Sequence, residues 1–220
     1  MQARAPVIPG RRVLILKMTL TNNKRKIWHN RGYLPHFDGE NAFQFVTFRL
    51  ADSLPRPVLR RWRSELERGE IVDVDFRRRI ESYLDQNYGS CVLKDSSIAS
   101  VIQDTLLIWD GVKYRLIAWV VMPNHVHFLA RILEGQSLSD IMHSIKSYTA
   151  HEANKILGKA GSFWYKESFD RYIRDEDHYF NTVAYIQNNP VKARLCASPE
   201  DWEFSSTFFK RNASPGPQAP

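Results

Sequence analysis

Two histidines separated by one valine, His125 and His127, lie in a run of apolar and β-branched residues that is typical of a β-strand. Successive side chains of a strand point to opposite faces, so the two imidazoles would share one face while Val126 and Phe128 pack on the other. Imidazole is the commonest metal ligand in proteins. The pattern therefore predicts a pair of metal ligands on one strand of a sheet.

The histidine pair matches neither of two common patterns for such sites. A histidine-triad nucleotide hydrolase needs a third histidine where this chain has Leu129, and a cupin-like site needs a glutamate near Arg131 and Ile132. A third ligand must therefore come from elsewhere in the chain. On the pattern alone, a second interpretation stays open, namely two histidines on a half-exposed strand that bind no metal.

A helix that could supply this ligand is predicted downstream, from Asp175 to Pro190. Asp175 is a typical N-cap, and Glu176 and Asp177 place negative charge in the first turn. Pro190 is expected to end the helix, because the residue before a proline disfavours the α conformation.

Two stripes run along this predicted helix. An apolar face directed to the core is predicted from the spacing of Tyr179, Val183 and Ile186, with Phe180 and Ala184 alongside. The opposite side carries the polar residues His178, Asn181, Tyr185, Asn188 and Asn189. Tyr185 lies in the middle of that polar stripe, and Asn189, one turn later, could offer an amide oxygen to the ion that the histidines hold. One helix would then supply both a phenol nucleophile and a metal ligand.

Several segments together resemble a known family. They are Met122-Pro123-Asn124-His125-Val126-His127, Gly161-Ser162-Phe163-Trp164, Phe169-Asp170-Arg171-Tyr172-Ile173-Arg174-Asp175, Tyr185-Ile186-x-x-Asn189-Pro190-Val191-Lys192-Ala193 and Asp201-Trp202. From about residue 31 to 206 the chain resembles the REP-associated tyrosine transposases. These are relatives of single-tyrosine insertion-sequence transposases in the HUH endonuclease superfamily, named after a histidine–hydrophobic–histidine motif. The resemblance implies that His125 and His127 bind metal, that Tyr185 is the nucleophile and that Asn189 is the third ligand, where some relatives have glutamine.

The resemblance also implies an activity. It is that of a metal-dependent single-stranded DNA endonuclease and strand transferase, which cuts at hairpin-forming repeats through a covalent 5′-phosphotyrosine. A phenol is a weak nucleophile at neutral pH because its pKa is about 10, so a bound cation must polarise the phosphate. The family implies Mg²⁺ or Mn²⁺, whereas imidazole ligands alone favour Mn²⁺ or Zn²⁺. The alternative is a DNA- or RNA-binding regulator that keeps the fold without cutting, whereas a purely structural zinc would need four closed ligands.

The charge balance fits a nucleic-acid partner. Lys and Arg number 31 against 24 Asp and Glu, a net charge of +7, which favours contact with phosphates. Two arginine-rich runs are candidate DNA contacts, although most such runs are solvated helix faces. Their arginines are Arg60, Arg61, Arg63, Arg77, Arg78 and Arg79. The expected partner is single-stranded DNA with a hairpin, and the sequence leaves open whether the protein is a monomer or a dimer.

The length and the 43% hydrophobic residues suit one catalytic domain. We expect that domain over residues 32–211, between a flexible basic segment, 1–31, and a flexible tail, 212–220. The predicted elements are strands at 42–50, 113–122, 125–132 and 169–173 and helices at 56–68, 74–88, 97–109 and around 138–148. They indicate an α+β fold, and the resemblance implies its ferredoxin-like, RRM-like version: an antiparallel sheet with helices packed on one face and the histidine strand in the centre. The helices of 56–109 have no predicted role.

The sequence also suggests where the protein works. It shows neither a signal sequence nor an apolar stretch long enough to span a membrane. Cys91 and Cys196 are far apart and form no Cys-x-x-Cys motif, so they are expected to be buried thiols and not a disulfide or a zinc site. We therefore expect a cytoplasmic, nucleoid-associated protein.

Overall fold

The centre of the molecule is a four-stranded antiparallel sheet with strand order β4-β5-β3-β6. Its strands are β3 (Phe43–Arg49), β4 (Tyr114–Val121), β5 (His125–Ile132) and β6 (Phe169–Tyr172). The computed structural model describes residues 27–30, 35–38 and 42–212. The histidine strand, β5, pairs with β4 on one side and β3 on the other. The α+β fold with an antiparallel sheet is thus confirmed.

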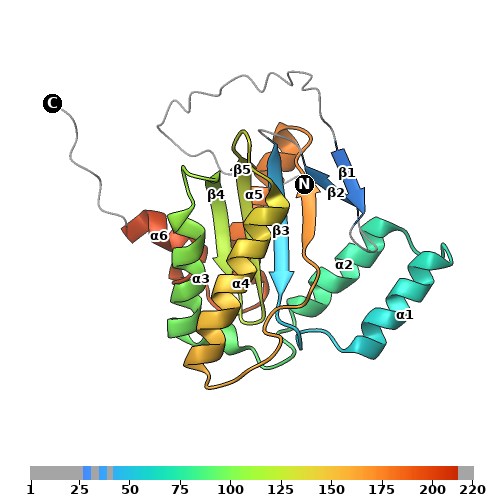
Figure 1. Cartoon of the computed structure of the whole chain (residues 1–220), viewed down its shortest axis with the longest axis horizontal. Helices are drawn as coiled ribbons and strands as arrows, with labels where there is room; N and C mark the ends of the chain where they lie inside the picture. Colours follow the sequence, from blue (N-terminus) through green and yellow to red (C-terminus); the bar gives the residue numbers. More distant parts are fainter. Residues whose placement is uncertain (1–26, 31–34, 39–41, 213–220) are drawn as a thin grey trace.

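Two helices cover one face of this sheet, α3 (Ser96–Ile108) and α4 (Leu138–Ile156), which lie in front of it in Figure 1. On that face β5 contributes Val126, Phe128 and Ala130, all fully buried in the main hydrophobic cluster together with residues of α3 and α4. These strand residues follow the period of two that places alternate side chains on one face.

A further helix, α5 (Glu176–Lys192), covers the opposite face. The expectation that helices pack on one face only is therefore correct for α3 and α4 and wrong for α5. The cause is that β4 and β5 are buried on both faces: Val120 and Leu129 point to the α5 side and pack with Ile186. Strands buried on both faces need a cover on each.

Two helices that the sequence left without a role, α1 (Arg56–Glu67) and α2 (Asp73–Leu84), lie beside the sheet, to the right in Figure 1. They form a hydrophobic cluster of their own with Leu54, and Tyr165 and Phe169 pack against it from the segment that leads into β6. This packing directs the C-terminal end of α2 toward the turn between β4 and β5, where Leu84 O accepts a hydrogen bond from Asn124 Nδ2.

The hairpin of β4 and β5 turns at Pro123 and Asn124, as predicted. Met122 N donates to His125 O at 2.8 Å, and Leu50 N, after β3, donates to Asn124 O at 2.9 Å. The turn is thereby tied to the neighbouring strand, which places His125 at the first position of β5.

Helix α5 begins after the predicted N-cap, since the Asp175 carboxylate accepts from His178 N. The prediction that Pro190 ends the helix is wrong, because α5 continues through Pro190 to Lys192. A proline inside a helix removes one backbone hydrogen bond. Here Asn189 and Pro190 are both buried, and Lys192 forms an ion pair with Asp85, and we attribute the persistence of the last turn to these contacts.

The remaining elements lie near the ends of the chain or between the larger elements. They are β1 (Ile27–Asn30), β2 (Pro35–Asp38), the short 3-10 helices η1 (Val92–Lys94) and η2 (Pro199–Asp201), and α6 (Ser206–Asn212). Of segment 1–31, expected to be flexible, only 27–30 is described, as a strand paired with β2; the rest lies outside the described residues, as does 213–220 of the expected tail. Among the described helices, none is long and apolar enough to cross a membrane.

Candidate active site

The two histidines of β5 meet on the α5 side of the sheet. His125 Nε2 and His127 Nε2 are 3.0 Å apart, and both side chains are fully buried. Each ring is held at its other nitrogen: His127 Nδ1 lies 2.7 Å from Thr47 Oγ1, and His125 Nδ1 lies 2.6 Å from Asn124 Oδ1. An amide oxygen only accepts, so His125 must carry its proton on Nδ1 and keep a lone pair on Nε2.

Asn124 owes its orientation to α2 and the residues after it. Its Nδ2 donates to Leu84 O at 3.3 Å and to Tyr88 O at 2.9 Å, so its oxygen is left for His125. Neither Asn124 nor Thr47 was predicted as a site residue. For Asn124 the signal was a polar residue directly before the histidine strand. Thr47 had none without the register that pairs it with His127.

Both histidines are neutral in this environment. Burial lowers the pKa of His125 to about 3, and the charge of Lys192 adds to the effect. Burial also lowers the pKa of His127 well below its ordinary value, with His125 and Lys192 as further causes. A neutral imidazole with a free lone pair is the form that binds metal.

Tyr185 reaches the histidines from α5. Its ring lies edge-on to that of His127, with centroids 5.3 Å apart, and Phe45 contacts both rings. The prediction that Tyr185 and Asn189 lie on the side opposite the core is wrong, since Tyr185 packs with the buried residues of the α5 side and Asn189 is itself buried. The Tyr185 hydroxyl is buried without a hydrogen-bond partner in the described part of the chain.

The same burial makes the Tyr185 phenol a weak acid. Its pKa is raised above the ordinary value by burial first, and then by the negative charges of Glu81 and Asp85, while the nearby Asn189 side chain and the charge of Arg171 oppose the rise. A tyrosinate at this position would therefore need a nearby cation, which agrees with a metal at the histidines.

Asn189 lies one turn beyond Tyr185 and is only 1% exposed. Its Nδ2 points to Asp85 Oδ1 at 3.5 Å, while its Oδ1 is buried and has no hydrogen-bond partner among the described residues. A buried acceptor without a partner is costly, and a bound cation would satisfy it.

These donors fit a divalent metal ion. The two Nε2 atoms lie 3.0 Å apart, and each neutral imidazole could offer a lone pair there to one ion. Within the described residues, no group of three or more His, Cys, Asp or Glu side chains could hold a metal. The candidate ligands are therefore His125, His127 and the Asn189 amide. Imidazole suits transition metals, and an amide oxygen also suits Mn²⁺ and Mg²⁺.

Four of the six arginines predicted to contact DNA form ion pairs within the chain. The pairs are Arg61–Glu65, Arg63–Glu167, Arg78–Asp75 and Arg79–Glu65. Arg60 is exposed. Arg77 lines a cavity of about 20 Å³ together with Phe45 and Thr47, both of which contact His127. Arg77 thus shares a cavity with two neighbours of His127, and DNA binding by the six stays a prediction.

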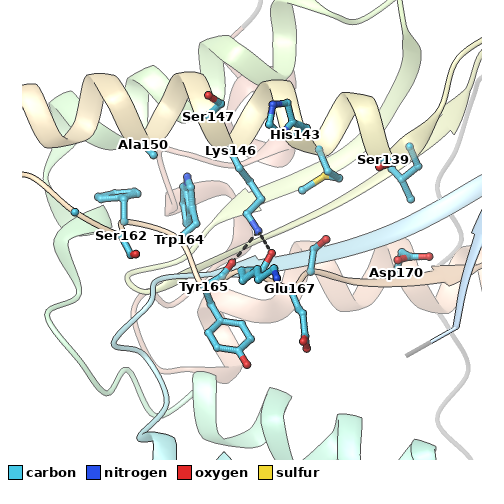
Figure 2. Close-up of a pocket in the computed structure, with 16 residues that line it drawn as sticks. Ser139, His143, Lys146, Ser147, Ala150, Ser162, Trp164, Tyr165, Glu167 and Asp170 are labelled. Atoms are coloured by element: carbon cyan, nitrogen blue, oxygen red, sulfur yellow. Dashed lines mark hydrogen bonds between the residues drawn. The ribbon is translucent and has the colours of Figure 1, made fainter. Parts of the chain in front are cut away.

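A larger cavity, of about 510 Å³, lies elsewhere, between α4 and the segment 161–170 (Figure 2). Neither histidine lines it, nor do Tyr185 and Asn189. Lys146 extends across it, and Nζ donates to Tyr165 O and Lys166 O at 2.7 Å each. The reactive groups described above are therefore separate from this cavity.

Comparison with known proteins relates these residues to a family. Residues 90–189, which include both histidines, Tyr185 and Asn189, match the family model described as "Transposase IS200 like". Over these residues the chain is similar to the IS200-like transposases. The matched region contains every residue for which the sequence predicted a part in the chemistry.

Two curated relatives agree with this assignment. Over 104 residues the chain is 30% identical to the REP-associated tyrosine transposase of Escherichia coli (strain K12), an alignment that covers 47% of this chain and 59% of that protein. Over 110 residues it is 24% identical to an uncharacterized protein of Haemophilus influenzae, covering 38% of this chain and 61% of the other. The chain thus spans about three fifths of the length of the curated relatives that it matches.

A solved structure of the REP-associated tyrosine transposase bound to a REP hairpin has the same fold. It matches with a TM-score of 0.55 and 18% identity, and the match covers 86% of this chain and 88% of that one. The resemblance to REP-associated tyrosine transposases that the sequence motifs predicted is confirmed.

Proposed function

We propose that this chain is a metal-dependent single-stranded DNA endonuclease and strand transferase, which cuts at hairpin-forming repeats through a covalent 5′-phosphotyrosine. The observation that carries the proposal is that Tyr185 of α5 contacts His127 of β5, whose Nε2 lies 3.0 Å from Nε2 of His125, within one chain. Two neutral imidazoles meet a phenol there, and the phenol has no hydrogen-bond partner among the described residues. Asn189, one helical turn beyond Tyr185, has a buried amide oxygen that is likewise without a partner in the described part of the chain.

Tyr185 Oη would attack the phosphorus of a DNA phosphodiester. The new bond joins the tyrosine oxygen to phosphorus, the bond from phosphorus to the 3′-oxygen breaks, and the 3′-oxygen takes up a proton while the phenol loses one. The bond energy is retained in the phosphotyrosine, so attack by a 3′-hydroxyl can join strands without ATP.

The chain's residues prepare this site before DNA arrives. Thr47 and Asn124 hold the two imidazoles by their Nδ1 atoms. Packing against Phe45 and His127 fixes the ring of Tyr185. A divalent ion held by His125, His127 and Asn189 would supply Lewis-acid polarisation of the phosphate. Mn²⁺ or Mg²⁺ is the proposed cofactor.

The proposed partner is single-stranded DNA that forms a hairpin. The relative of known structure was solved with a REP hairpin, and the net charge of +7 in this chain favours phosphates. A DNA substrate of this kind would place the protein at the nucleoid, in the cytoplasm.

The first test is covalent capture of the protein on DNA. Wild-type protein is incubated with labelled single-stranded repeat DNA and Mn²⁺, and a denaturing gel is examined for a protein–DNA adduct. Tyr185→Phe should form none, whereas the matched control Tyr179→Phe, on the same helix, should form it. An adduct with Tyr185→Phe would exclude Tyr185 as the nucleophile. Undiminished cutting in excess EDTA would exclude the metal mechanism.

The second test concerns the form of the substrate. A single strand can bend so that the tyrosine and the leaving 3′-oxygen are in line, whereas duplex DNA, with a persistence length of about 150 base pairs, resists bending. We expect cleavage of one repeat as a single strand and as a hairpin with a single-stranded flank, and little cleavage of the perfect duplex. Duplex binding should persist at low salt and weaken as salt rises. Equal cleavage of the duplex would identify an ordinary duplex nuclease.

A further inference from the structure

The C-terminal end of α2 touches the candidate active site at two points. Leu84 O holds the amide of Asn124, which in turn holds His125. The next residue, Asp85, contacts α5, since its Oδ1 is 3.5 Å from Asn189 Nδ2 and its Oδ2 is 2.6 Å from Lys192 Nζ. Leu84 and Asp85 both lie outside the region 90–189 that matches the family.

The carboxylate of Asp85 decides which end of the Asn189 amide faces it. An NH₂ group beside a carboxylate is attracted, whereas the flipped amide would bring its partly negative oxygen against Asp85 Oδ1. The flipped state is therefore disfavoured, and Oδ1 is directed away from Asp85. Only the oxygen end of an amide has lone pairs for a metal ion, so this orientation is the one that binding requires.

Asp85 is itself well placed to act as a fixed support. Its side chain is only 11% exposed, and both of its oxygens are engaged, one by Asn189 and the other by Lys192. Lys192 Nζ also lies 5.6 Å from the centre of the Tyr185 ring. With both oxygens occupied, Asp85 is better suited to hold a ligand than to become one.

We propose that Asp85 is a positioning residue, which orients the Asn189 amide so that Oδ1 is presented as a metal ligand. This role rests on the proposed function, since only a metal-bound Asn189 needs a particular amide orientation. It also gives the α1–α2 segment a role, because the end of α2 brings both Leu84 and Asp85 to residues that support the metal ligands.

The test is calorimetric titration of the metal-free full-length chain with Mn²⁺. Asp85→Ala should weaken Mn²⁺ binding by about 10–100-fold, as is typical when the partner of a ligand is removed. The matched control Asp75→Ala removes another carboxylate of α2, which forms an exposed ion pair with Arg78, and should leave the affinity unchanged. Thermal unfolding of each metal-free variant checks the fold.

A second substitution distinguishes two possible roles of Asp85: orienting the Asn189 amide, and only holding α2 against α5. In Asn189→Asp both ends of the side chain are acceptors, so no orientation is needed. Asp85→Ala should then leave Mn²⁺ affinity unchanged or tighten it, because a neighbouring negative charge is removed. A purely structural role would weaken binding equally with either residue at position 189. If Asp85→Ala fails to fold, Asp85→Leu, which also lacks an acceptor for Asn189 Nδ2, takes its place in the same comparison.

The outcomes separate this proposal from the proposed function. Mn²⁺ binding that His127→Ala abolishes, but that Asp85→Ala leaves as in the wild type, would overturn the role of Asp85 and leave the metal site intact. Equal weakening in both position-189 backgrounds would also overturn it. A wild type that binds no Mn²⁺ would overturn the metal site and the role of Asp85 together. None of these measurements depends on cleavage of DNA.

Discussion

The two faces of β5 carry buried side chains of opposite character, apolar on one face and polar on the other. Toward α3 and α4 the strand presents Val126, Phe128 and Ala130, all apolar and fully buried. Toward α5 it presents His125 and His127, equally buried but polar, next to a phenol and an amide oxygen that have no partners among the described residues. Apolar burial stabilises the fold, while buried polar groups with unmet bonds are unfavourable unless something else binds them. Neighbouring residues of β5 thus have different roles: those facing α3 and α4 stabilise the fold, and those facing α5 form the candidate active site.

The largest effects are expected when two adjacent residues of β5, one on each face, are truncated to alanine, which tests whether the two faces have separate roles. Phe128→Ala should lower the free energy of unfolding by about 3–5 kcal/mol, since it leaves a cavity in the main core. His127→Ala should abolish Mn²⁺ binding and cleavage, and should lower the stability of the metal-free protein by a smaller amount, about 1–3 kcal/mol, because Thr47 loses its buried partner. Urea denaturation and Mn²⁺ calorimetry of both variants measure the two effects.

If Phe128→Ala lost metal binding as completely as His127→Ala while still folded, the two faces would not be separable. Refolding conditions and protein concentration should be matched, so that a difference in affinity does not reflect unfolded protein. His125→Ala should behave as His127→Ala does.

A smaller effect is expected at the turn that joins the two strands. Asn124→Ala removes the acceptor that holds His125 Nδ1 and the donor to Leu84 O and Tyr88 O. We expect Mn²⁺ affinity to fall by about 10–100-fold and stability by about 1–3 kcal/mol, because the buried carbonyl of Leu84 and the partly buried carbonyl of Tyr88 lose a partner. Unchanged affinity would show that the orientation of His125 does not depend on Asn124.

The sequence was informative where the signal is local. The His-x-His alternation places both imidazoles on one face of a strand, and the caps and spacing of α5 place Tyr185 and Asn189 one turn apart, so these residues could be predicted. Thr47 and Asp85 could not, because their roles depend on contacts between segments distant in sequence. Asn124 had a local signal, as the polar residue directly before the histidine strand, but its orientation depends on the distant Leu84 and Tyr88. The same reason hid the position of α5 on the second face of the sheet. The continuation of α5 past Pro190 depends on burial and on Asp85, which a local rule for proline does not contain.

A smaller effect on stability is expected from Tyr185, on the face of β5 that carries the candidate active site. Its hydroxyl is buried without a partner in the described part of the chain, and such a group destabilises the fold. Tyr185→Phe should therefore leave the metal-free protein as stable as the wild type, or stabilise it by up to about 1 kcal/mol, although it removes the proposed nucleophile. Thermal and urea unfolding of the two proteins would measure this. A clear loss of stability would mean that the hydroxyl has a structural partner.

The smallest effect is expected from Lys146, which extends from α4 across the larger cavity (Figure 2). None of the candidate metal ligands lines that cavity. Burial lowers the pKa of Lys146 from 10.5 to about 8, and the charge of Arg49 lowers it further while Glu167 opposes the shift. Between about pH 8 and pH 10.5 the unfolded chain keeps this proton while the folded chain loses it, so the contribution of Lys146 to stability rises with pH. The free energy of unfolding of wild type minus that of Lys146→Met should therefore be larger at about pH 9.5 than at about pH 7.5 in urea denaturation.

The matched control is Lys155→Met, which replaces an exposed lysine of the same helix. Mn²⁺ affinity should not change in either variant. A difference that is flat or falls with pH would contradict the buried lysine, and a loss of Mn²⁺ binding would show that the two faces are coupled.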